Sequence, residues 1–131
     1  MTDILTWTAT LATHVDEMDK EHQTLINLMN KLNKLCKDKA PKSEIGKALE
    51  ELGAFTVKHF SDEEQYMQSI NFSQLSTHKI HHKQLLERFT EHATNFKNGP
   101  QSVLPDEFFE FLKFWLTTHI MHIDQKYSPA Q

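Results

Sequence analysis

The stretch EMDKEHQTLINLMNKLNKLCKD, residues 17–38, carries the pattern that decides the fold. Its candidate core positions recur at alternating steps of four and three residues, which places them on one face of an α-helix. These positions are Met18, His22, Leu25, Met29, Leu32 and Cys36. The stretch therefore predicts an amphipathic helix whose buried face carries a histidine.

Three further stretches show the same helical periodicity. A second helix is expected after Pro41 and Ser43, because both residue types are common at helix starts. A third is expected from about Ser73 to Phe96, and a fourth from Pro105, with two acids in its first turn where the helix dipole favours negative charge. The inward positions of these helices are Ile45, Leu49, Leu52, Thr56, His59, Glu63 and Tyr66, then Leu75, His78, His82, Leu85, Phe89, Ala93 and Phe96, then Phe108, Phe111, Leu112, Trp115 and His119.

The order of these segments predicts the fold class. No run alternates with period two, so no strand is expected. Four helices joined by short connections favour an all-α, up-down-up-down antiparallel four-helix bundle. We expect one domain over residues 1–131, with an N-terminal extended arm at 1–16 and the bundle at about 17–124. Gly99 is expected to end the third helix in the left-handed conformation.

Composition excludes several classes of protein. A chain of 131 residues has room for one core, and a net charge of −4 argues against a nucleic-acid surface. No apolar run approaches membrane-spanning length, so no membrane insertion is expected, and Met1-Thr2-Asp3 does not begin a secretory signal. Cys36, the single cysteine, excludes an intrachain disulfide. These features indicate a cytoplasmic protein.

Histidine is the unusual component, with nine residues in the chain. A single histidine on an apolar face is usually a hydrogen-bonded core residue, but here polar groups recur on the buried faces of all four expected helices. Burying a carboxylate and several imidazoles without partners is costly, and a metal ion would offset that cost by accepting their lone pairs. The residues concerned are His22, His59, Glu63, His78, His82 and His119.

Spacing supports convergence of these side chains on one point. His59 and Glu63 are four residues apart, as are His78 and His82, so each pair projects from one helix face. Antiparallel packing brings the four sets of ligands to similar heights. Asp124 is different, because it follows His119 by five residues and would point well away from that face in a regular helix. It reaches the site only if the fourth helix bulges, for instance by a π-type turn.

Ligand chemistry narrows the choice of metal. Five imidazoles with carboxylates are too many ligands for one tetrahedral zinc ion. The set contains no thiolate, and it is too rich in nitrogen for calcium or magnesium. Imidazole combined with carboxylate suits iron, and the number of donors suits two ions.

The chain resembles the hemerythrin family over nearly its whole length. The resemblance rests on Asp19-Lys20-Glu21-His22, on His59-Phe60-Ser61-Asp62-Glu63-Glu64, on His78-x-x-x-His82 and on His119-x-x-x-x-Asp124. It implies two iron ions joined by an oxo or hydroxo bridge. By this resemblance His78, His82 and His119 would bind one iron, His22 and His59 the other, and Glu63 and Asp124 would bridge them. Dioxygen would bind at the iron with two histidines, in an apolar pocket formed by Leu25, Phe60, Trp115, Leu116 and Ile120.

The resemblance also implies the function. We expect reversible dioxygen binding for oxygen storage, transport or local delivery, without enzymatic activity, and with an oxygen-consuming protein partner that the sequence does not identify. Two alternatives stay open: an oxygen or redox sensing module that acts through a partner, and a di-iron enzyme that handles peroxide, nitric oxide or ferrous iron.

Four histidines match no ligand position of the family; they are His14, His81, His92 and His122. Of these, His81 is expected to be exposed.

Overall fold

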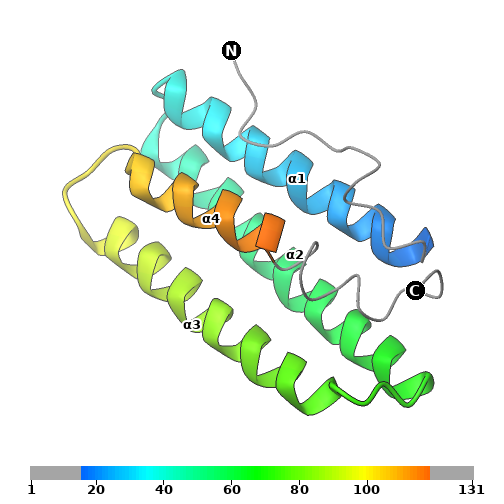
Figure 1. Cartoon of the computed structure of the whole chain (residues 1–131). Coiled ribbons are helices and arrows are strands. Elements are labelled where there is room, and N and C mark those ends of the chain that lie inside the picture. Colours follow the sequence, from blue (N-terminus) through cyan, green and yellow to red (C-terminus); the bar gives the residue numbers. More distant parts are fainter. Residues whose placement is uncertain (1–15, 119–131) are drawn as a thin grey trace.

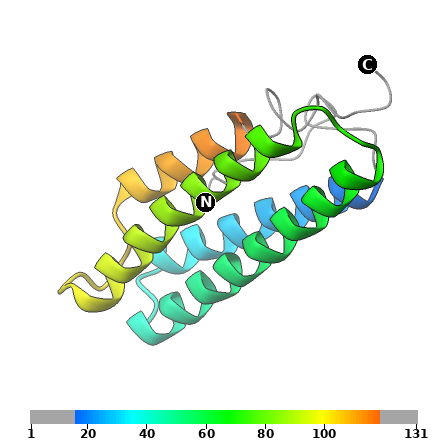
Figure 2. The ribbon, with the colours of Figure 1, turned by 90° about the horizontal axis from the view of Figure 1, so that it is seen from below.

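The computed structural model describes residues 16–118 and contains four α-helices in that range. They are α1 (Asp16–Lys37), α2 (Lys42–Ser69), α3 (Leu75–Asn98) and α4 (Asp106–Thr118). The helices lie side by side and the chain reverses direction at each connection (Figures 1 and 2), with α2 packed against both α1 and α3. The predicted all-α antiparallel bundle is confirmed. None of the helices within 16–118 has both the length and the apolar character required to cross a membrane.

The predicted core faces are largely correct. Every predicted inward position of α1 is buried. In α2, Tyr66 is only partly buried and Met67 takes the core position instead, and in α4 Phe109 and Leu116 are buried while Phe111 is partly exposed. The predicted positions Leu75, Leu85 and Ala93 of α3 are likewise only partly buried. One helix face is wide enough to bury neighbouring positions, and sequence spacing does not show which of them is the more deeply buried.

The connections after α1 and α2 share one backbone motif. Lys39 and Asn71 both have a φ of 54°, in the left-handed region. The amide of Ala40 donates to the carbonyl of Leu35, and the amide of Phe72 donates to the carbonyl of Met67. These bonds satisfy carbonyls that the end of a helix would leave without donors, as in a Schellman motif.

The conformation predicted for Gly99 is wrong. Gly99 follows α3 with φ −90° and ψ 174°, which is extended backbone. A glycine is nevertheless required there, because a Cβ atom would lie 2.6 Å from the carbonyl oxygen of Asn95. The absence of a side chain therefore allows a close backbone approach, and not a left-handed turn.

Two apolar clusters lie along the bundle, and the polar residues of interest lie between them. The larger cluster extends from the loop after α3 to Leu25 on α1 and Phe60 on α2, and the smaller one contains Met18 and Met67. His22 lies between Met18 and Leu25 in the sequence of α1, and Glu63 lies between Phe60 and Met67 in α2. The fold thus encloses a polar layer within an apolar interior.

Candidate metal centre

Two groups of potential metal ligands form this polar layer. His22, His59 and Glu63 make one group, and Glu63, His78 and His82 make the other. Within each group the donor atoms lie within 4.8 Å of one another, and all five residues are buried. Glu63 belongs to both groups, so the two groups are parts of one centre.

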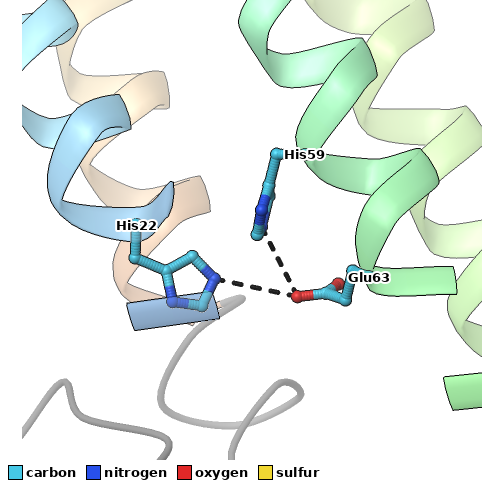
Figure 3. Close-up of side chains that lie close together, drawn as sticks. All are labelled: His22, His59 and Glu63. Atoms are coloured by element: carbon cyan, nitrogen blue, oxygen red, sulfur yellow. Dashed lines mark ion pairs between the residues drawn. The ribbon is translucent and has the colours of Figure 1, made fainter. Parts of the chain in front are cut away.

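The carboxylate of Glu63 faces the two groups with different oxygen atoms. Its Oε1 lies 2.8 Å from Nε2 of His82. Its Oε2 lies 3.4 Å from Nε2 of His59 and 3.7 Å from Nε2 of His22. Figure 3 shows these two imidazoles directed at the same carboxylate, His22 from α1 and His59 from α2. One carboxylate between two sets of imidazoles has the arrangement required to bridge two metal ions.

Helical spacing explains how the chain assembles this layer. His59 and Glu63 are one turn apart on α2, and His78 and His82 are one turn apart on α3. The rings of His22 and His59 meet edge to face with centroids 4.6 Å apart, although they come from different helices. The rings of His78 and His82 are 5.4 Å apart. The convergence predicted from spacing is therefore present for these five residues.

Two carboxylates contact the histidines from outside this layer. Oε1 of Glu21 lies 2.7 Å from Nδ1 of His59, and Oε2 of Glu64 lies 2.8 Å from Nδ1 of His82. Both histidines thus direct Nε2 to Glu63 and Nδ1 to a second carboxylate. Glu21 and Glu64 were not predicted to have a role in the site, although each is the immediate neighbour of a predicted ligand.

A lysine connects this arrangement to the surface. Nζ of Lys58 lies 2.7 Å from Oδ2 of Asp62 and 3.4 Å from Oε2 of Glu21. The hydrogen bond to Asp62 and the negative charge of Glu21 raise the pKa of Lys58 above its usual value. The ammonium group therefore stays protonated beside Glu21, and it links α1 to α2 next to His59.

Apolar side chains close the centre on the side of the main core. The ring of Phe60 stacks on the imidazole of His82, and the rings of Phe60 and Trp115 meet edge to face with centroids 5.9 Å apart. Leu25 and Leu116 are fully buried in the same cluster. Four of the five residues predicted to form the oxygen pocket are thus buried core residues; the fifth, Ile120, lies outside the described residues.

Several other predictions also concern residues beyond the described range. The predicted ligands His119 and Asp124 lie after residue 118, as does His122. The predicted extended arm at 1–16, which contains His14, lies before the described range except for residue 16. The prediction for His81 was wrong, because its side chain is partly buried. His92 packs its ring against Phe108 and Phe111, consistent with a role in packing.

Comparison with known proteins agrees with this geometry. Residues 13–130 match the family profile of the hemerythrin HHE cation binding domain. The chain belongs to the hemerythrin family. It is 33% identical to bacteriohemerythrin of Methylococcus capsulatus over 128 residues, covering 97% of this chain and 96% of that protein. It is also 31% identical to the hemerythrin-like protein of Naegleria gruberi, covering 93% and 89% of the two chains.

Solved hemerythrin structures share the fold. Wild-type hemerythrin aligns with a TM-score of 0.87 at 32% identity, over 95% of each chain. An alanine mutant of hemerythrin aligns with a TM-score of 0.89 at 31% identity, over 98% of this chain and 97% of that one. The similarity therefore covers the whole hemerythrin bundle.

The cofactor of this hemerythrin domain is a pair of iron ions, and the residues present fit it. Each half of the buried layer offers two imidazoles and one oxygen of Glu63. Nitrogen and oxygen donors without thiolate suit iron. The five donor residues are at most 2% exposed, so the layer is shielded from bulk water.

Proposed function

We propose that this protein binds dioxygen reversibly at its di-iron centre and serves in oxygen storage, transport or local delivery. The observation that carries the proposal is the position of Glu63, a fully buried carboxylate with one oxygen 2.8 Å from His82 and the other facing His59 and His22. A buried charge of this kind is costly unless it is paired or coordinates metal. Two adjacent cations beside one carboxylate offset that cost.

The proposed ligand set follows the two halves of the layer. His22 and His59 would hold one iron and His78, His82 and His119 the other, while Glu63 and Asp124 would bridge the pair. Five of these seven residues meet in the buried layer. His119 and Asp124 complete the set on the strength of their match to the family motif.

The surrounding residues favour binding over further reaction. When bound, the iron pair would supply reversible two-electron chemistry toward dioxygen. Leu25, Phe60, Trp115 and Leu116, with Ile120, would form an apolar wall that keeps water and acid from this reaction. An excess of neutral imidazole over carboxylate also limits the stabilisation of strongly oxidised iron, whereas ferritin-like sites use more glutamates. For these reasons we propose a binding protein and not an enzyme, with dioxygen as its ligand.

Spectra of the reduced protein under alternating oxygen and argon test this function. A reversible visible absorption band over many cycles, with two irons per chain, is the expected result. Rapid irreversible oxidation with turnover of peroxide, nitric oxide or ferrous iron would contradict carriage and favour a di-iron enzyme. Iron content is measured on the same samples, so that loss of metal is not mistaken for loss of oxygen binding.

Two further expectations are part of the proposal. Residues 1–131 form one domain, an assignment supported by the single bundle of α1 to α4. A cytoplasmic location stays a prediction, and the free thiol of Cys36 is compatible with a reducing compartment.

A further inference from the structure

We propose that Glu21 and Glu64 are positioning residues that orient one histidine ligand in each half of the centre. The inference rests on the proposed di-iron site, and it extends that site to residues outside the ligand set. Glu21 lies on α1 and contacts His59 on α2, while Glu64 lies on α2 and contacts His82 on α3. Each carboxylate therefore holds a histidine of the next helix.

The geometry determines which nitrogen can bind metal. An ionised carboxylate only accepts hydrogen bonds, so Nδ1 of His59 and Nδ1 of His82 donate their protons to Glu21 and Glu64. Each Nε2 points inward instead, 3.4 Å (His59) and 2.8 Å (His82) from Oε2 and Oε1 of Glu63, so that in the iron form it would offer its lone pair to the metal beside that carboxylate. Such a partner fixes the tautomer and ring orientation and makes the imidazole a better donor.

The two positioning residues differ in their surroundings. Glu21 is 7% exposed and shares Lys58 with Asp62, so it is held in place from the surface. Glu64 is partly exposed and lines an open groove between α2 and α3 with a volume of about 770 Å³. His82 and Phe60 line the same groove, as do the lysines Lys79 and Lys83. The carboxylate that contacts His59 is therefore more deeply buried than the one that contacts His82.

This difference makes the two residues separately testable. Loss of the Glu21 side chain would remove both the contact with His59 and the link through Lys58 between α1 and α2. Loss of the Glu64 side chain would remove its contact with His82, while the ring of His82 would stay stacked on Phe60. We expect each change to weaken iron binding about 10- to 100-fold, as is usual for such outer partners.

The experiment compares Glu21→Ala and Glu64→Ala with Glu21→Gln and Glu64→Gln, whose amide oxygen can still accept from Nδ1. Glu17→Ala on α1 and Glu51→Ala on α2 are the matched controls, because Glu17 is exposed and Glu51 pairs with Lys31 at the surface. Nitrogen-15 NMR of the metal-free proteins reports the protons on Nδ1 of His59 and His82. Competition with a ferrous chelator reports iron affinity.

The expected result is a protected Nδ1 proton on both rings in the wild type. Each alanine variant should lose that proton on its own histidine alone and release iron more readily, and the glutamine variants should restore the proton and most of the affinity. Wild-type proton signals and iron affinity in both alanine variants would overturn the positioning role. A wild type that fails to bind two irons would instead overturn the proposed di-iron function, so the two failures are distinguishable.

Discussion

The ring of Phe60 lies parallel to the imidazole of His82, with centroids 3.9 Å apart and an angle of 1° between the planes. Phe60 belongs to α2 and His82 to α3, so this stack joins neighbouring helices at the metal centre. The stack restrains the face of the His82 ring, while Glu64 and Glu63 contact its two nitrogens. The orientation of this ligand is therefore determined by its neighbours as well as by its own helix.

Replacing Phe60 with leucine removes the stack while keeping most of the apolar volume. We expect the free energy of unfolding of the metal-free protein to fall by about 1 kcal/mol or more, because an aromatic pair contributes about 0.5–1.5 kcal/mol beyond area burial. Urea denaturation measures this loss. Phe114→Leu is the control, since Phe114 is 73% exposed and should change stability by no more than about 0.5 kcal/mol. Equal effects of the two substitutions would refute the role of the stack.

Replacing Glu63 with alanine removes the carboxylate shared by both halves of the centre. We expect the variant to retain at most one iron per chain, since each half loses an oxygen donor. Metal analysis after gel filtration gives the ratio of iron to protein. Glu51→Ala, in the same helix but at the surface, should keep two irons. Two retained irons and normal oxygen binding in Glu63→Ala would show that Glu63 does not bridge the pair.

Removing the metal should lower the thermal stability of the bundle. Ligands that bind only the folded state add to its stability, and the five buried polar residues of the centre lose their metal in the apo protein. We expect the apo form to melt at least about 5 °C below the iron form, which corresponds to somewhat more than about 1 kcal/mol for a domain of this size. Differential scanning calorimetry makes the comparison. Identical melting temperatures would contradict metal binding by these residues.

Two glycines should respond to alanine in opposite directions. Gly46 lies within α2, and a Cβ atom there would have no neighbour within 4 Å. Gly46→Ala should therefore raise stability by about 0.5–1 kcal/mol. Gly99→Ala should lower it, because its Cβ would lie 2.6 Å from the carbonyl oxygen of Asn95. Chemical denaturation of the two variants gives the signs, and a stabilising Gly99→Ala would refute the close approach.

Cys36 should make stability fall at alkaline pH. Burial raises the pKa of its thiol above the ordinary value of 9.0, against smaller opposing effects of a backbone hydrogen bond at Leu104 and the charge of Lys37. The folded state then keeps the proton to higher pH than the unfolded state, so this contribution is complete below pH 9 and declines as pH rises through the folded pKa. Denaturation of the wild type and Cys36→Ala between pH 8 and 10 isolates it. Parallel pH profiles would exclude this effect.

The amino-acid sequence alone was enough to predict four helices, most of their buried faces and five of the residues that meet in the polar layer. Helical periodicity is local, so steps of three and four residues identify the face on which His22, His59 or His78 lies. The shortage of apolar side chains at those positions pointed to metal, because buried imidazoles and carboxylates need a partner. These inferences did not depend on how the helices are rotated against each other.

The contacts of Glu21 and Glu64 with the histidines were decided only by the tertiary structure. Each glutamate is about 100° around its helix from the adjacent ligand position, where sequence spacing alone would place it at the edge of the buried face. The packing of α1 on α2 and of α2 on α3 brings these edges together, so that the Nδ1 atoms of His59 and His82 meet carboxylates. The rotation of one helix against another depends on side chains along the whole interface, and no local stretch of sequence contains that information.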